Sequence, residues 1–230
     1  MNDKNNKLSK ILSGFPQKVR ENPRLVISKF FCAYDLGEHL WYIDTWMDSV
    51  NANDYWKEND PSFLFFYYED LNEMINATYI ISKEEKRHKT ALDILREKGL
   101  DDERNLLHPA LYFGWQQYGT MWDFFPRSLS KEEFINPYLV LRKFFKFQSL
   151  EKWHQTLHDL LADSFSSRRT PADPMEGIDL SYIRKNLHKL VEAAHLIDVR
   201  EMDKIAGKYP KKEIYTLDVP YPEVLLRDKM

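Results

Sequence analysis

Two pairs of side chains have the types and the spacing to hold a metal ion. Glu151 is followed three residues later by His154, and Glu192 is followed three residues later by His195. Residues three apart lie on the same face of an α-helix, so each carboxylate and imidazole could share one ion. The pattern therefore suggests a metal-binding helical bundle or a metalloenzyme, with these four residues as ligands and a divalent metal as cofactor.

These motifs lie on two predicted helices joined by a long loop. Residues 149–165 and 179–200 both place apolar side chains three and four apart, which predicts one buried face on each helix. The simplest expectation is that the two faces pack against each other. Ferritin-like bundles place such motifs on alternate helices, whereas here the helices are consecutive. A third copy, Glu85 with His88, lies in the charged run 84–89 and is expected on a solvated surface.

A second chemical candidate is the stretch 142–147, which alternates basic with aromatic side chains. Basic groups can neutralise phosphates while aromatic rings stack on bases, and proteins that bind single-stranded nucleic acids combine the two. The candidate nucleic-acid-binding residues are Arg142, Lys143, Lys146, Arg168 and Arg169. The simpler interpretation of this stretch is an amphipathic helix whose basic side chains extend over a buried aromatic face.

Prolines mark where several of the other helices begin. Asn22 before Pro23, and Asp60 before Pro61, each combine a capping side chain with a proline suited to the first helical turn. A further proline predicts a helix over residues 109–125, with its tryptophans in the core.

Two capping boxes, in which a serine and a glutamate bond each other's backbone amides, mark further helix starts. Ser82 with Glu85 predicts a new helix over residues 83–98. Ser130 with Glu133 predicts another helix directly after residue 130.

These patterns together predict an all-α protein, an irregular bundle of about seven to nine helices with an extended C-terminal tail. Residues 1–206 form the predicted helical domain, with a possible subdomain boundary near 99–108. Residues 207–230 contain several prolines and one alternating apolar segment, which is typical of an extended tail. One extended segment cannot form a sheet alone, so the tail is expected to contact the bundle or a partner.

The composition favours a globular protein over a membrane protein. Of the 230 residues, 43% are hydrophobic and 30% are charged, which is usual for a globular chain. No apolar run approaches the roughly 18 residues of a membrane helix, and the polar first ten residues lack the apolar core of a signal peptide. A cytoplasmic protein without membrane contact is expected. Cys32, the single cysteine, has aromatic neighbours that predict a buried thiol.

The sequence favours a non-catalytic cytoplasmic protein that acts through protein–protein contact, with a homodimer as one form of that contact. The net charge of −3 is too small to indicate a nucleic-acid partner by itself. Two alternatives stay open, namely the metal site of the Glu-x-x-His pairs and nucleic-acid binding through residues 142–147 and the two loop arginines. Neither the substrate nor the partner can be named from these residues.

Overall fold

The structure is a computed structural model that describes residues 13–51, 56, 60–84, 88–100, 102–113, 121–165 and 179–201. All the regular elements in these ranges are helices. They are α2 (Gln17–Glu21), α3 (Pro23–Ala33), α4 (Leu36–Asn51), α5 (Pro61–Ser82), α6 (Ala91–Glu97), η1 (Glu103–Leu107), η2 (Pro109–Leu111), α7 (Lys131–Ile135), α8 (Tyr138–Phe147), α9 (Leu150–Ser164) and α10 (Leu180–Arg200). The predicted all-α fold class is confirmed. The predicted tail, 207–230, lies outside the described residues.

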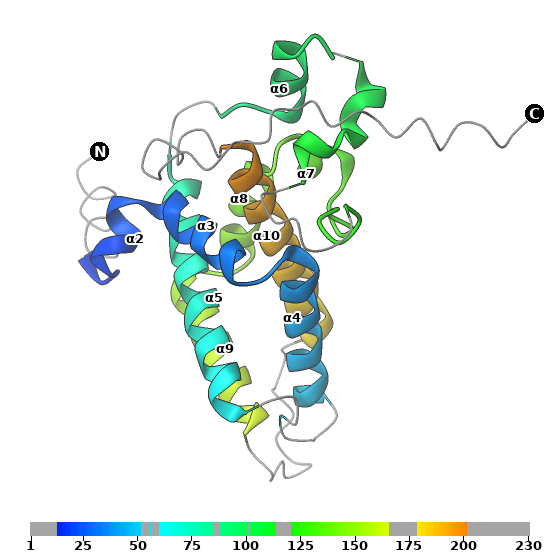
Figure 1. Ribbon diagram of the computed structural model, residues 1–230. Coiled ribbons are helices and arrows are strands. Elements are labelled where there is room, and N and C mark those ends of the chain that lie inside the picture. Colours follow the sequence, from blue (N-terminus) through cyan, green and yellow to red (C-terminus); the bar gives the residue numbers. More distant parts are fainter. Residues whose placement is uncertain are drawn as a thin grey trace, which may run out of the picture.

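The long helices form two sides of the bundle. Helices α5 and α9 run side by side along one side, and α4 packs against α10 along the other (Figure 1). Helix α3 contacts both α5 and α10, and α8 contacts the same two helices. The apolar stripes of α9 and α10 therefore have main partners other than each other, because α9 packs mainly on α5 and α4. The expectation that the two stripes pair was wrong.

Two hydrophobic clusters fill the interior. The larger one joins all the long helices and includes the fully buried rings of Trp46 and Trp153. The smaller one joins α6, η1, η2 and α7, and α10 contributes Leu196 to it. Residues on both sides of the predicted boundary near 99–108 belong to this smaller cluster. The boundary itself, like the 1–206 domain limit, stays a prediction.

Three helix starts that depend on local capping side chains lie where they were predicted. The Asn22 side chain accepts a hydrogen bond from the amide of Leu25, and Asp60 caps α5 through the amide of Ser62 at 2.8 Å. Ser130 and Glu133 form a complete capping box at the start of α7. In each case a short polar side chain satisfies a backbone amide that the helix leaves unpaired.

Two helix predictions were wrong. Helix α5 continues through Ser82, whose hydroxyl donates to the carbonyl of Tyr79 at 2.6 Å, so this serine does not cap a new helix. The next described helix starts at Ala91, with Thr90 as its cap. Within the helix predicted over 109–125, the described residues form only the short η2 turn and, at 121–125, turns and bends with Trp122 62% exposed. Residues 114–120 of that prediction lie outside the described residues.

The thiol prediction was also wrong. Cys32 is exposed, because the buried face of α3 is made by the residues that precede it, namely Val26, Ile27, Phe30 and Phe31. No helix in the described ranges is both long enough and apolar enough to cross a membrane.

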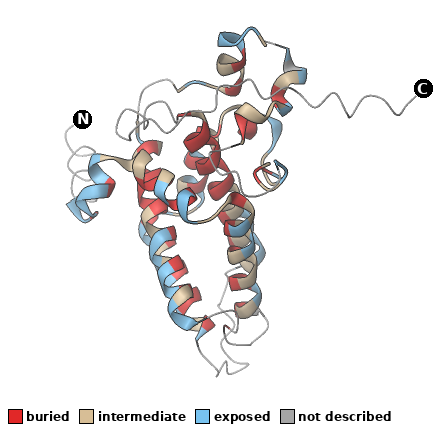
Figure 2. Ribbon diagram, viewed as in Figure 1, coloured by how far each residue is buried: buried red, intermediate tan, exposed pale blue. Residues whose placement is uncertain are grey.

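Helix α10 changes character along its length. Residues 190–199 are all buried, so this half of the helix is enclosed on every side (Figure 2). The first half, residues 180–189, has only two buried residues, Ile183 and Leu187, and otherwise borders solvent. Several of the side chains that could bind a ligand or an ion lie on this helix.

Candidate anion-binding groove

In the buried half of α10, polar side chains form hydrogen bonds with other segments of the protein. Glu192 is fully buried, and its carboxylate accepts hydrogen bonds from the amides of Arg127 and Ser128 at 2.8–3.0 Å. Burial raises the pKa of Glu192, although these amide bonds oppose the shift. The carboxylate thus anchors the segment that leads into α7.

His195, one turn later, is also hydrogen-bonded to the backbone of another segment. Its Nε2 lies 2.7 Å from the carbonyl oxygen of Tyr112, to which it donates, and the ring packs against Phe31 and Phe124. Burial lowers the pKa of His195 to about 4, against the effect of the carbonyl bond. The imidazole is therefore neutral near pH 7 and serves as a buried hydrogen-bond donor.

The other predicted metal pair lies on α9 and has different surroundings. Glu151 is exposed, and His154 bonds the side-chain oxygen of Asn76 on α5 at 2.9 Å. Burial lowers the pKa of His154, partly offset by the charge of Glu151. Across the described ranges, no three His, Cys, Asp or Glu side chains are arranged to hold an ion. The metal site stays a prediction.

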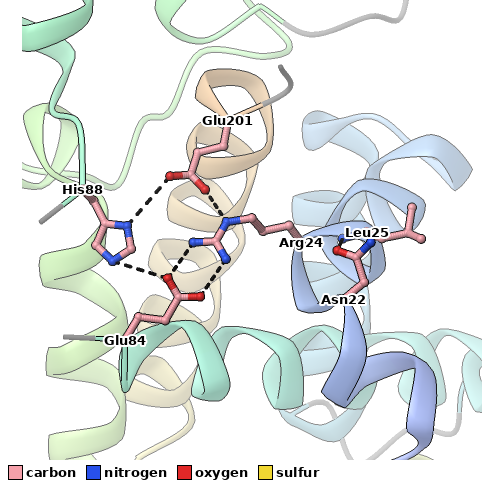
Figure 3. Close-up of polar contacts among 6 residues, drawn as sticks. All are labelled: Asn22, Arg24, Leu25, Glu84, His88 and Glu201. Atoms are coloured by element: carbon pink, nitrogen blue, oxygen red, sulfur yellow. Dashed lines mark hydrogen bonds and ion pairs between the residues drawn. The ribbon is translucent and has the colours of Figure 1, made fainter. Parts of the chain in front are cut away.

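His88 was expected on a solvated surface, and this expectation was wrong. Its side chain is only 5% exposed, and its ring stacks on Tyr138 with the ring centres 3.6 Å apart. Its two nitrogens lie 3.9 Å from a Glu84 oxygen and 3.8 Å from a Glu201 oxygen (Figure 3). The burial of His88 could not be predicted from the charged run around it, because Tyr138 is far away in the sequence.

Arg24 joins the same two carboxylates from the opposite side. Its two terminal nitrogens donate to the two oxygens of Glu84 at 2.7 and 2.8 Å, and its Nε donates to Glu201 (Figure 3). This cluster, which we call the Arg24 clamp, ties the start of α3 to the ends of α5 and α10. Bidentate pairing of this kind fixes geometry as well as charge.

A second ionic contact joins α4 to the exposed half of α10. His188 Nε2 lies 2.9 Å from an Asp44 oxygen, and Arg184 pairs with Asp48. Burial lowers the pKa of His188, while Asp44 acts in the opposite direction. Because Arg184 and His188 each have a carboxylate partner on the facing helix, this contact holds the two helices together.

One set of side chains in the described part of the chain faces open space between α8 and α10. They enclose a groove of about 220 Å³, and its lining residues are Glu133, Val140, Lys143, Phe144, Phe147, Tyr182, Lys185, Asn186 and Lys189. Val140 and Phe144 are buried and form the apolar base. Phe147 and Tyr182 are each more than half exposed and border the opening.

The groove is positively charged. Its lining contains three lysines and one glutamate, which leaves a net charge of +2. Glu133 accepts from Lys143 at 2.8 Å and from Lys189 at 2.6 Å, and it also accepts the amide of Ser130. Burial alone would raise the pKa of Glu133, but these partners outweigh it and hold the pKa at about 2. Lys185 has no carboxylate partner among the contacts of the described residues.

The groove divides the predicted nucleic-acid-binding residues. Lys143 lines it, together with Phe147 one turn later. Arg142 and Lys146 are exposed on α8 but do not line the groove, since they lie one turn apart on another face. Arg168 and Arg169 lie outside the described residues.

The residues that α10 contributes to the groove were not predicted from the sequence. Tyr182, Lys185 and Lys189 are three and four residues apart, and this spacing places them on one helix face beside the buried stripe. That signal is visible in the sequence, but it gains meaning only when α8 is known to lie opposite.

Comparisons with known proteins identify no relative. No family model matches the chain, and neither a curated protein nor a solved structure matches it. The arrangement of the groove therefore carries the functional argument alone.

Proposed function

We propose that this protein is a non-catalytic binding protein whose groove between α8 and α10 takes a segment of single-stranded nucleic acid. The observation that supports this is the convergence of three lysines and two exposed aromatic rings on one cavity. Lysines would neutralise phosphates, and Tyr182 and Phe147 would stack on bases. Stacking of this kind tolerates any sequence because every base has a flat face.

The residue types favour nucleic acid over a protein partner. Lysine is depleted at the centre of protein–protein interfaces, whereas basic and aromatic residues together are usual in grooves for single strands. The apolar base formed by Val140 and Phe144 suits a flat ring more than a charged surface. Because the groove is basic while the whole chain has a charge of −3, binding is expected to be local and of moderate affinity.

The acidic group of the groove supports a binding role more than a catalytic one. A general base works best when its pKa is close to the operating pH. The pKa of Glu133 is held at about 2, and its oxygens already accept from two ammonium groups and a backbone amide. Its carboxylate is therefore a weak base near neutral pH.

Fluorescence anisotropy with a labelled oligothymidylate tests the proposal. Tyr182→Ala should weaken binding roughly tenfold or more, since stacking contributes about 1–3 kcal/mol per base, while Tyr182→Phe should bind like the wild type. Lys185→Ala should weaken binding and reduce the salt slope by about 0.7, the value for one phosphate contact on a single strand. Lys152→Ala, an exposed lysine on α9, is the matched control.

Two results would contradict the proposal. One is an affinity that does not change with salt. The other is an equal affinity for the wild type, Tyr182→Ala and Lys185→Ala. In either case the expected protein–protein contact becomes the leading hypothesis, and the mass in solution tests whether that contact is a homodimer.

A further inference from the structure

Glu133 occupies an unusual place in the groove, because it is an acid inside a site that attracts acids. Its side chain is only 4% exposed and lies between the ammonium groups of Lys143 on α8 and Lys189 on α10. The amide of Ser130 fixes the carboxylate from the α7 side. These three contacts hold the Glu133 carboxylate beside the two ammonium groups.

This carboxylate has two opposing effects on an incoming anion. It holds two ammonium groups beside the cavity, and each ammonium keeps further N–H donors for a ligand. It also repels the ligand's negative charge from behind the lysines. The repulsion is poorly screened because the carboxylate is almost enclosed by protein.

The repulsion should outweigh the ordering effect. Lys189 lies between two helices and has a side chain that is only 22% exposed, so packing restricts it even without Glu133. The charges of Lys143 and Lys189 are already partly used by a shared partner, whereas Lys185 is not engaged in this way. The free positive charge of the groove is therefore concentrated at Lys185, beside Tyr182.

We infer that Glu133 is an internal competitor that weakens the groove's hold on anionic ligands and leaves Lys185 as its main phosphate contact. The inference rests on the proposed function and adds the residue that sets its affinity. A built-in competitor of this kind makes ligand exchange fast and keeps the salt dependence of binding shallower than three phosphate contacts would give. It does so without lowering the number of lysines that attract the ligand.

The variant Glu133→Gln in the full chain tests the inference. Glutamine keeps the shape and the acceptor for Ser130, and it is accepted in a capping box, so the fold should be preserved. We expect this variant to bind oligothymidylate about tenfold more tightly. Its salt slope should steepen by about 0.7 for each lysine that gains a phosphate contact.

Unchanged or weaker binding by a folded Glu133→Gln variant would overturn the inference and make Glu133 an orienting residue. A second measurement covers the case in which that variant does not fold. If Glu133 competes, Lys143→Ala should lose less affinity than Lys185→Ala, because the charge of Lys143 is already partly offset by Glu133. An equal or larger loss for Lys143→Ala contradicts the inference.

Inorganic tripolyphosphate separates this inference from the proposed function. Calorimetric titration should show that Glu133→Gln binds tripolyphosphate about tenfold more tightly than the wild type does. If tripolyphosphate follows this pattern while oligothymidylate does not bind, the nucleic-acid proposal fails and the role of Glu133 stands. If neither probe binds to either protein, both proposals fail.

Discussion

The two halves of α10 carry similar numbers of ionisable side chains but use them in opposite ways. In the first half, Lys185 and Lys189 border an open cavity. In the second half, Glu192 and His195 are buried and bonded to the segments packed around them. The same helix therefore borders an open groove at one end and forms a structural polar core at the other.

The difference shows why residue type alone is a poor guide to chemistry. Glu192 and His195, which have metal-ligand spacing, bond the backbone of Tyr112, Arg127 and Ser128, because the protein encloses them. Lysines with no special motif became the candidate site, because they meet a cavity lined by aromatic rings. Burial and available partners decide which role a charged side chain takes.

The largest expected effect comes from removing an anchor in the buried half. Glu192→Ala leaves the amides of Arg127 and Ser128 without their acceptor, so unfolding free energy should fall by about 4–5 kcal/mol. Urea denaturation measures this loss. Glu151→Ala, the exposed glutamate of the other predicted metal pair, should change stability by less than about 0.5 kcal/mol.

The same pair of variants also tests the metal hypothesis. If the wild type holds a stoichiometric metal that both variants lose, the Glu-x-x-His pairs act together and the contrast between them fails. Equal metal content in all three proteins, combined with the unequal stability losses, supports the contrast.

A second effect concerns Asp198, which lies in the buried half of α10 and is 9% exposed. Burial raises the pKa of Asp198 to about 7, well above its ordinary value of 3.8. A raised carboxyl pKa favours the folded state at low pH, and this advantage is lost as pH rises from about 4 to 7. Asp198→Asn should therefore be more stable than the wild type at pH 8, by up to about 4 kcal/mol.

Unfolding curves at a series of pH values check this expectation. The gap between Asp198→Asn and the wild type should close as pH falls and should be near zero below pH 4. A gap that is independent of pH would show that Asp198 is already charged in the folded protein.

A smaller effect with the opposite sign is expected from His195. Its folded pKa of about 4 lies below the ordinary value of 6.5. Its contribution to stability is therefore complete above pH 6.5 and is lost as pH falls to 4, a change of about 3 kcal/mol. His195→Gln keeps a donor for the Tyr112 carbonyl but does not titrate in this range. Its stability should fall less steeply than that of the wild type between pH 6.5 and 4.

The matched control for this pH series is His158→Gln on α9, where the histidine is exposed. Its curve should run parallel to that of the wild type. Parallel curves for both histidine variants would mean that His195 does not stay neutral when it is buried.

The smallest effect on stability is expected in the exposed half of α10. Lys185→Ala should change the unfolding free energy by less than about 0.5 kcal/mol, because the side chain is exposed and away from the buried anchors. Thermal melting checks this value beside the anisotropy assay. A large loss of stability would mean that Lys185 is structural, and the contrast between the two halves would disappear.

Features of the fold that depend on neighbouring residues could be predicted from the sequence. The caps at Asn22, Asp60 and Ser130 were correct because the capping side chain and the amide it satisfies are only two or three residues apart. The Ser82 box failed although its local pattern was equally good. Ten of the residues of α5 are buried, and its packing carries the helix through Ser82.

Features that join distant segments could not be predicted in this way. Nothing local to His88 indicates that its ring stacks on Tyr138, and nothing local to Lys185 indicates that α8 lies opposite. The basic and aromatic residue types at 142–147 did point to the helix that contributes Lys143 and Phe147 to the groove. They did not show which of its basic residues face the groove, because that depends on the partner helix.

The Arg24 clamp also has a consequence for the order of folding. Arg24 and Glu201 are separated by 177 residues, and Arg24 and Glu84 by 60. During synthesis the N-terminal segments emerge first, so α3 and α5 are complete long before the end of α10 leaves the ribosome. The clamp can close only after residue 201 has emerged. The early helices must therefore wait for their last partner, and the clamp closes later than the contact between α3 and α5.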